Sequence, residues 1–596
     1  MEFLIITNLI RFPIDPDMKI FLSPKPKNEE ILPFSYEMTA ETVLIAPDSR
    51  EMKFVVDAFS EFFIVDWCVD PPFRVFLTAS DKIDSLENIE VLRNYFKAAE
   101  ISHSQGYVIN SLENSIIIMA NKPVGVFYGL MTLLQAVFIS QDSTIRYPAL
   151  LVKDYPDMEI RGLSDDISRG QVPNVKSLKR NIRLYSKFKL NQYLLYVEDV
   201  FSFSKYPSIG KERGALTAAE IVEVQEYAEK HFVELIPIFQ TLGHWENYFW
   251  TPEFMEFAEF PGGNSLDMSY PKTYELLEDL LKQITTAFKS KYFHIGCDES
   301  WHVGIGKGKE YIEKMGLGNA YAKHYNWVIS KLKEFGKEKI YLYHDIASKF
   351  KEVNDSLPKE DLIYVFWKYH EANEYPELMS IVDANIPFVV SSSILNWCKI
   401  YPDLEKAERT NLALIKYGFK HGAKGQIVSS WGDNGEENLR ENNHYGFCCA
   451  SAISWNINGY DTDTFLRAYC NTTFGNCTPE LIELFTLIKS SPKIMESQIF
   501  SEFFAYFWRN PFPNQDIDNP MHYWNQEYSS DYKEDAESHF LRMKQICQEL
   551  TNKVFRNFIF LDHIDYFADA VITLIRKIQY TYKISFLCED QLDAEK

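Results

Sequence analysis

Two adjacent carboxylates end an apolar run near the middle of the chain. Asp298 and Glu299 directly follow the segment Tyr292–Cys297, whose length and composition are typical of a buried strand. Neighbouring carboxylates that are not solvated repel each other, so a fold keeps such a pair where something uses or compensates it. By itself the pair would also suit a helix cap or a salt bridge, and the rest of the chain has to decide between these uses and acid–base chemistry.

Adjacency restricts the chemistry that two carboxylates can perform on a sugar. Enzymes that cleave glycosides usually place their two carboxylates on opposite sides of the scissile bond, which sequence neighbours cannot do. A neighbouring pair suits a reaction in which Glu299 protonates the leaving oxygen while Asp298 orients a nucleophile that belongs to the substrate. A 2-acetamido group is such a nucleophile, because its carbonyl oxygen can close on C1 to give an oxazolinium ion.

Composition narrows the class of protein. The 596 residues carry a formal net charge of −23, which argues against a nucleic acid or an anionic membrane as partner. The nine cysteines are scattered and include no CxxC, which is typical of free thiols in a reducing compartment. The N-terminus lacks a basic leader and no run reaches transmembrane length, so we expect a cytoplasmic protein. No metal-ligand spacing occurs around His302 and the carboxylate pair, and we expect neither a metal nor a cofactor.

The hydrophobic pattern predicts an α/β protein in three parts: an α+β domain over 1–152, a (β/α)8 TIM barrel over 153–465 and a helical domain over 466–596. The C-terminal helices would pack on the barrel or form a contact between two copies in a homodimer. Eight apolar runs, each followed by a helical stretch, are the expected barrel strands: Glu159–Asp166, Gln192–Glu198, Glu234–Thr241, Tyr292–Cys297, Ile340–Asp345, Leu362–Trp367, Phe388–Ser393 and Gln426–Trp431.

Polar or aromatic residues close each of these runs. The carboxyl ends of barrel strands form the active-site face of this fold, so side chains from all eight are expected to converge on one pocket. The residues concerned are Asp166, Asp199, His244, Asp298, Asp345, Trp367, Trp397 and Trp431.

A family resemblance supports the same interpretation. His294-x-Gly296-x-Asp298-Glu299 matches the HxGxDE signature of glycoside hydrolase family 20, the β-N-acetylhexosaminidases. Further segments resemble the first, second, third and last barrel strands of that family: Arg161-Gly162-Leu163 with Asp166-Ile167-Ser168-Arg169, Lys189-Leu190-Asn191, Gly243-His244 and Trp431-Gly432-Asp433.

The resemblance implies a retaining exo-β-N-acetylhexosaminidase that acts on terminal β-linked GlcNAc or GalNAc. Glu299 and Asp298 would be catalytic. The implied substrate-binding residues are Arg161 and Asp433 on the sugar hydroxyls, His244 behind the acid, Trp431 as the floor, and Trp367 and Trp397 as walls.

Some positions depart from the family pattern. Gln240 stands where many members have Asp, and Leu194 and Tyr196 replace the usual histidines of the second strand. The tyrosine that holds the acetamido group has two candidates, Tyr343 and Tyr369. These changes leave a catalytically silent carbohydrate-binding protein on the same barrel as the alternative.

Overall fold

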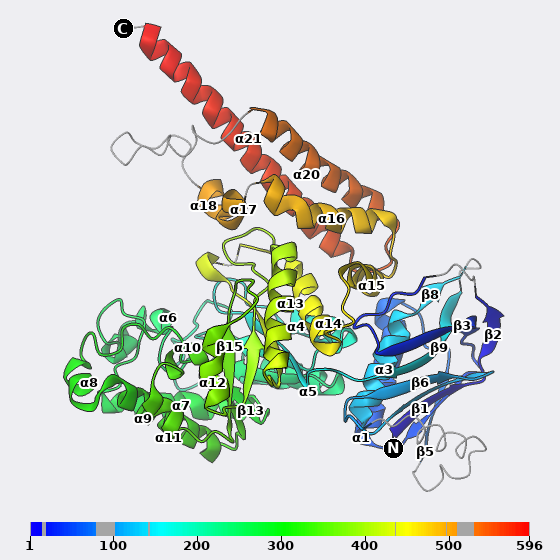
Figure 1. The fold of residues 1–596 in the computed structure, drawn as a ribbon, viewed down its shortest axis with the longest axis horizontal. Coiled ribbons are helices and arrows are strands. Elements are labelled where there is room, and N and C mark those ends of the chain that lie inside the picture. Colours follow the sequence, from blue (N-terminus) through cyan, green and yellow to red (C-terminus); the bar gives the residue numbers. More distant parts are fainter. Residues whose placement is uncertain are drawn as a thin grey trace.

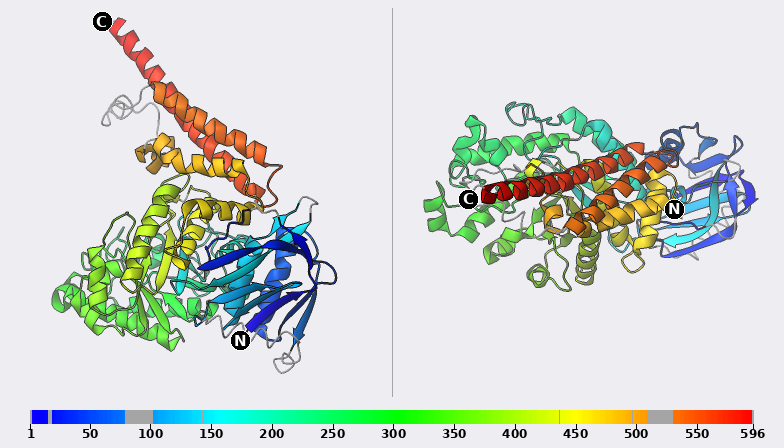
Figure 2. Two further views of the ribbon diagram at one scale, coloured as in Figure 1. Left: turned by 45° about the vertical axis from the view of Figure 1, so that its right-hand side comes forward. Right: turned by 90° about the horizontal axis from the view of Figure 1, so that it is seen from above.

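The computed structural model describes residues 2–14, 19–78, 102–140, 144–435, 437–495, 497–508 and 530–594. The chain forms a sheet domain, a barrel and a helical region that stands above both (Figures 1 and 2). The predicted fold class, a (β/α)8 barrel between an α+β domain and C-terminal helices, is therefore confirmed.

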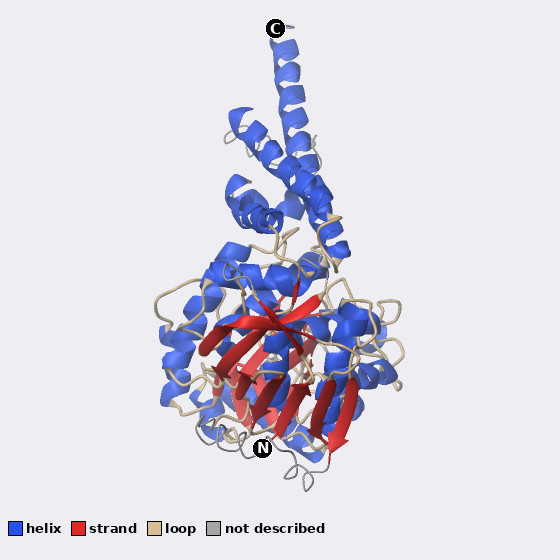
Figure 3. Ribbon diagram, turned by 90° about the vertical axis from the view of Figure 1, so that its right-hand side faces the viewer, coloured by secondary structure: helices blue, strands red, loops and turns tan. Residues whose placement is uncertain are grey.

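The N-terminal domain is one mixed sheet in the order β2-β3-β9-β6-β7-β1-β4-β5, with β8 paired to β9. Figure 3 shows its strands in front of the barrel. Side chains alternate between two faces, so that Leu4 and Ile6 pack with the helices while Phe3 and Ile5 form a small core on the other face. The elements are β1 Glu2–Thr7, β2 Ile10–Pro13, β3 Asn28–Glu37, β4 Val43–Pro47, α1 Arg50–Glu61, β5 Arg74–Thr78, β6 Tyr107–Ser111, β7 Ser115–Ala120, α3 Pro123–Gln135, β8 Phe138–Ile139 and β9 Ile145–Asp154.

Eight parallel strands close the barrel in chain order, and all eight coincide with the predicted runs to within a few residues. The strands are β10 Ile160–Asp166, β11 Gln192–Tyr196, β12 Glu234–Ile238, β13 Tyr292–His294, β14 Lys339–Tyr343, β15 Leu362–Trp367, β16 Phe388–Ser391 and β17 Gly425–Ser430. The helices between and after them are α4 Val175–Lys187, α5 Ala218–Lys230, α6 Glu246–Phe249, α7 Pro271–Ala287, α8 Lys309–Met315, α9 Leu317–Glu334, α10 His344–Ala347, α11 Lys351–Ser356, α12 Met379–Asp383, α13 Leu404–Lys420 and α14 His444–Trp455.

The barrel strands are mostly apolar because both of their faces are buried, and the polar residues of β10 and β17 gather toward their carboxyl ends. One set of side chains packs under the surrounding helices, and the other fills the interior, where Leu194, Ile236, Tyr341 and Val389 lie together. Trp367 and Trp431 pack against the interior cluster. The interior is thus a filled core, and the loops after the strands carry the polar residues.

The helical region consists of α15 Thr462–Phe474, α16 Pro479–Ile494, α17 Ser497–Ser501, α18 Phe503–Trp508, α20 Ser530–Leu550 and α21 Phe558–Ala594. Helices α16, α20 and α21 lie side by side, and the end of α21 projects away from the barrel (Figures 1 and 2). No described helix combines the length and the apolar character that a membrane span needs. None of the cysteines in the described parts of the chain forms a disulfide bond.

Candidate active site

The carboxylate pair lies on the loop after β13, where the backbone is strained. Gly296, Cys297 and Glu299 have φ values of 66°, 67° and 46°. A Cβ atom on Gly296 would lie 2.0 Å from Oε1 of Gln240, so this position requires glycine. Residues other than glycine cost about 1–3 kcal/mol each in such conformations, and surrounding contacts must hold them there.

Gln240, on the loop after β12, supplies two of these contacts. Its Nε2 donates to Oδ1 of Asp298 at 2.8 Å, and its Oε1 accepts from the backbone N–H of Cys297 at 2.9 Å. The same Nε2 also donates to the hydroxyl of Tyr196 at 3.1 Å. A neutral amide therefore orients Asp298, at the position where many members of the resembled family have Asp.

His244 lies between the two carboxylates. Its Nε2 is 3.6 Å from Oδ2 of Asp298 and 3.7 Å from Oε2 of Glu299. Glycine precedes it because a Cβ on Gly243 would lie 2.7 Å from the backbone oxygen of Asp298. Burial lowers the pKa of His244, but the Asp298 carboxylate outweighs burial and raises that pKa to about 9. The imidazole is therefore charged at neutral pH.

The two carboxylates acquire different proton affinities. Burial acts to raise the pKa of Asp298, but the charge of His244 and the hydrogen bond from Gln240 outweigh burial and hold the pKa below its usual value. Burial and the charge of Asp298 raise the pKa of Glu299. Two carboxyl groups whose pKa values are pushed apart can act as an ionised group and a proton donor. The directions of these pKa shifts suit Asp298 to the ionised state and Glu299 to the protonated one.

Asp345, on α10 after the neighbouring strand β14, stabilises the loop that carries the carboxylate pair. Its Oδ2 accepts the backbone N–H of Glu299 at 3.2 Å. This hydrogen bond holds Glu299 in its conformation of positive φ. Burial and the nearby charge of Asp298 raise the pKa of Asp345 to about 7.

Arg169 links the first, second and last strands of the barrel at this rim. Its guanidinium lies 3.2 Å from carboxylate oxygens of Asp166, Glu198 and Asp433. The side chain of Asp433 is 46% exposed, so the Arg169–Asp433 pair presents a donor and an acceptor toward solvent. Such a pair suits the hydroxyl groups of a sugar.

Arg161 does not belong to this site, contrary to the sequence-based prediction. It is the second residue of β10, at the amino end of the strand, and it is completely buried. Its guanidinium donates to the backbone oxygens of Met158 and Lys189 and to the hydroxyl of Tyr128. Active-site residues lie at the carboxyl ends of barrel strands, so the position of Arg169 just after β10 could have identified it as the arginine of this site.

The three predicted tryptophans meet around Tyr369. Nε1 of Trp431 donates to the Tyr369 hydroxyl at 2.9 Å. The Tyr369 ring stacks on Trp367 with centroids 5.2 Å apart and lies 5.5 Å from the ring of Trp397. Trp397 comes from the loop beyond β16, not from the strand end. The second tyrosine candidate, Tyr343, is 3% exposed and packs with the barrel interior.

Other polar residues singled out from the sequence have structural partners. Nδ1 of His294 accepts from the N–H of Gly296 at 2.9 Å, and burial lowers the pKa of His294 to about 3, which keeps it neutral. Asp199 pairs with Arg213 at 3.2 Å. In the described parts of the chain, no group of three or more His, Cys, Asp or Glu side chains is arranged to hold a metal ion.

The glycine-rich segment 304–309 binds a carboxylate of its own chain. The backbone N–H groups of Gly304, Gly306 and Gly308 donate to the carboxylate of Glu259 at 2.7, 3.2 and 2.9 Å. These three hydrogen bonds anchor the loop that follows the carboxylate pair.

The barrel matches a known family of proteins. Residues 158–437 match the family model described as glycosyl hydrolase family 20, catalytic domain. A β-hexosaminidase A from Caenorhabditis briggsae is 24% identical over 387 residues, which are 60% of this chain and 63% of that protein. A probable β-hexosaminidase from Arthroderma benhamiae is 27% identical over 228 residues, which are 34% of this chain and 37% of that protein. The chain thus spans less than two thirds of these curated relatives.

Solved structures share the fold. A Flavobacterium johnsoniae chitobiase has a TM-score of 0.62 at 19% identity, covering 96% of this chain and 94% of its own. An exo-β-N-acetylglucosaminidase from Vibrio harveyi, solved with N-acetylglucosamine, has a TM-score of 0.60 at 17% identity and covers 80% of this chain and 79% of its own.

Proposed function

The barrel of this chain belongs to glycosyl hydrolase family 20, and on that premise we propose that the protein is a retaining exo-β-N-acetylhexosaminidase. The observation that carries the proposal is the pair Asp298–Glu299, which shares the charged His244 at the barrel rim. The tryptophans around Tyr369 offer an apolar surface for the face of a sugar ring.

In the proposed first step Glu299 donates its proton to the glycosidic oxygen as the bond to C1 breaks. The carbonyl oxygen of the substrate's own 2-acetamido group attacks C1 and forms an oxazolinium ion. Asp298 remains ionised, accepts a hydrogen bond from the acetamido N–H and balances the positive charge that develops on that group. The raised pKa of Glu299 supports its role as donor, and the lowered pKa of Asp298 supports its role as acceptor.

In the second step a water molecule attacks C1 from the side that the leaving group has vacated. Glu299, now ionised, takes a proton from that water. The bond between C1 and the acetamido oxygen breaks at the same time, which opens the oxazolinium ring and restores the acetamido group. Two inversions at C1 give overall retention. The product is a free N-acetylhexosamine of β configuration.

Tyr369 is the better of the two candidates for holding the acetamido carbonyl. Its oxygen accepts from the indole of Trp431, so its own hydrogen can donate to a ligand. Tyr343 lies within the barrel core beside His294, with ring centroids 4.3 Å apart.

A chromogenic β-N-acetylglucosaminide tests the proposal. We expect release of the chromophore by the wild-type protein and a loss of about 10²–10⁴-fold in Glu299→Gln, because the general acid is removed. Asp298→Asn should lose activity without rescue by azide, since the nucleophile is part of the substrate. Equal turnover of the corresponding β-glucoside, which lacks the acetamido group, would contradict the substrate-assisted mechanism. Binding of the sugar without any turnover would instead favour a silent sugar-binding protein.

A further inference from the structure

Gln240 uses both ends of its side-chain amide, and its partners fix which end is the donor. Its Oε1 accepts from the backbone N–H of Cys297, a group that can only donate. Its Nε2 donates to Oδ1 of Asp298 at 2.8 Å. The backbone oxygen of Gln240 accepts from the indole of Trp245 at 3.1 Å, which holds the residue in place. The N–H end of the amide therefore points at Asp298.

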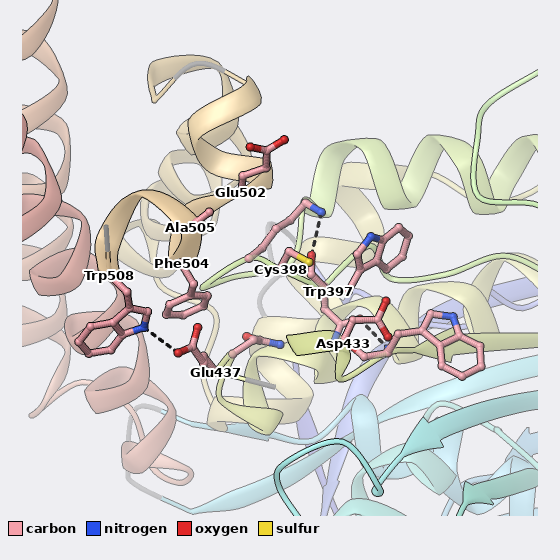
Figure 4. Close-up of a pocket in the computed structure, with 12 residues that line it drawn as sticks. Trp397, Cys398, Asp433, Glu437, Glu502, Phe504, Ala505 and Trp508 are labelled. Carbon is pink, nitrogen blue, oxygen red and sulfur yellow. Dashed lines mark hydrogen bonds between the residues drawn. The ribbon is translucent and has the colours of Figure 1, made fainter. Parts of the chain in front are cut away.

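Gln240 can influence a bound sugar only through Asp298. The proposed sugar residues Trp397, Trp431 and Asp433 line a cavity of about 400 Å³ at the barrel rim (Figure 4). Gln240 is 1% exposed and does not line this cavity. Its amide therefore acts on the orientation and the charge of Asp298 and makes no contact with the sugar itself.

Each oxygen of the Asp298 carboxylate has a partner within the protein. Oδ1 accepts from Gln240, and Oδ2 lies 3.6 Å from Nε2 of His244. A carboxylate oxygen can accept more than one hydrogen bond, so Asp298 can still accept the acetamido N–H that the proposed mechanism assigns to it. The hydrogen bond from Gln240 thus stabilises the ionised form of Asp298 without adding a group that titrates.

A carboxylate in place of this amide would add such a group. Glutamate has the shape of glutamine, so one of its oxygens would lie beside Oδ1 of Asp298, at the 2.8 Å that the present hydrogen bond spans. Two carboxyl groups at this distance share one proton, because both cannot be ionised without strong repulsion. The shared proton is lost as the pH rises, whereas the N–H of an amide is kept.

Other titratable and charged groups face Asp298 from the surrounding elements. They are Arg169 after β10, Tyr196 on β11, His244 after β12, His294 on β13 with Cys297 and Glu299 after it, Tyr343 on β14 with Asp345 after it, and Tyr369 after β15. A change at Gln240 leaves all of these groups in place. The ratio of variant to wild-type activity at each pH therefore reports the group that is added or removed.

We propose that Gln240 is a positioning residue that keeps Asp298 ready to accept the acetamido N–H at neutral and alkaline pH, so that a neutral amide at this position extends the working range of the enzyme upward. The proposal rests on the proposed function. It adds that the replacement of a carboxylate by this amide determines the pH range of the substrate-assisted step.

The test compares kcat/KM of wild-type protein and Gln240→Glu for p-nitrophenyl β-N-acetylglucosaminide at about pH 5 and about pH 8. At the higher pH the shared proton is lost, and we expect the variant to be at least about tenfold slower than wild type. At the lower pH the protonated carboxyl can donate to Asp298 as the amide does, and the variant should come within about threefold of wild type. An equal loss at both pH values, or no loss at either, would overturn the proposal.

A neutral variant and a matched control complete the comparison. Gln240→Met removes the hydrogen bond without adding a charge, and we expect a loss of about 10–100-fold that is no smaller at pH 5 than at pH 8. Full activity of Gln240→Met would overturn the proposal, also if Gln240→Glu fails to fold. Gln545 on α20 donates to Oε1 of Glu549 at the same distance, 2.8 Å, but on the surface. Gln545→Glu is thus the same change in an exposed place and should match wild type at both pH values.

A binding measurement separates this proposal from the proposed function. N-acetylglucosamine-thiazoline carries a ring nitrogen in place of the acetamido nitrogen, and its affinity is measured by calorimetry. Gln240→Glu should bind it more weakly than wild type at about pH 8 and nearly as well at about pH 5. If wild-type protein binds the thiazoline but cleaves no substrate, the proposed activity fails and this affinity ratio decides the role of Gln240. An affinity ratio that is the same at both pH values would overturn that role, and wild-type protein that neither binds nor cleaves would overturn both proposals.

Discussion

At the scale of single residues, one charged imidazole connects the two carboxylates that would perform the chemistry. His244 lies within 3.7 Å of both. Its charge lowers the pKa of Asp298 and also lowers that of Glu299, against the effects of burial on each. The imidazolium therefore favours the ionised form of Asp298. Glu299 keeps its proton because burial and the charge of Asp298 raise its pKa by more than the imidazolium lowers it.

Replacing His244 by Gln should therefore move both limbs of the pH profile of kcat/KM to higher pH. The acid limb reports the ionisation of Asp298, whose pKa rises when the cation is lost. The alkaline limb reports the deprotonation of Glu299, whose pKa also rises. A profile that keeps its position in His244→Gln would contradict this assignment.

The ion pair between His244 and Asp298 stabilises the folded protein in a defined pH range. The pKa of His244 is raised to about 9 in the folded state, so its contribution is complete below about pH 6.5 and is lost as the pH rises through 9. The contribution of Asp298, whose pKa is lowered, is present above its ordinary pKa and is lost as the pH falls through the folded value.

Arg161 and Arg169 separate two roles that sequence motifs alone do not distinguish. Arg169→Met should lower kcat/KM about 10–100-fold, because charge-assisted hydrogen bonds to the sugar are lost, and should also lower the thermal midpoint, because the buried carboxylates of Asp166 and Glu198 lose their cation. Arg161→Met should destabilise the fold as well, since it leaves the buried backbone oxygens of Met158 and Lys189 without a donor, but should leave kcat/KM of the folded protein near that of the wild type. Kinetics and thermal unfolding of the two variants check this, and a loss of kcat/KM in Arg161→Met alone would restore Arg161 to the site.

The sequence predicts the pair Asp298–Glu299, His244 and the tryptophans because these follow strand ends or match a spaced motif. It does not separate Arg161 from Arg169, since both lie in the matching segment and only the position along the strand distinguishes them. Tyr369 and Asp345 gain their roles from contacts across neighbouring strands. No local spacing encodes those contacts.

At the scale of elements, the loops after the barrel strands are held by buried carboxylates of the same chain. Glu259 accepts three backbone N–H groups from the glycine-rich segment 304–309 and is 1% exposed. Sequence spacing does not reveal this anchoring, because the partner carboxylate lies on another loop.

Glu259→Ala should release this segment. Each buried N–H group without an acceptor costs about 1–3 kcal/mol, so we expect a lower thermal midpoint and faster tryptic cleavage after Lys307 and Lys309. Glu253→Gln, in the exposed 3-10 helix Pro252–Phe257, is the matched control and should behave as wild type. Unchanged cleavage in Glu259→Ala would show that other contacts order the loop.

At the scale of the whole molecule, one buried carboxylate joins all three parts. Asp66, from the sheet domain, forms ion pairs with Arg183 and Lys187 of α4 and lies 3.4 Å from Arg556, between α20 and α21. Burial opposes its charge, but the three cations outweigh burial and hold the pKa of Asp66 well below its ordinary value. This junction fixes the helical region, and with it α18, relative to the barrel rim.

Asp66→Asn should loosen that junction, because Arg183, Lys187 and Arg556 would lose the buried carboxylate that they share. Removing one partner of a buried ion pair costs about 3–5 kcal/mol, which we expect as a lower denaturant midpoint for the C-terminal helices. Asp57→Asn, on the exposed face of α1, is the control and should leave the midpoint unchanged. An unchanged midpoint in Asp66→Asn would show that other contacts hold the helical region against the sheet domain and α4.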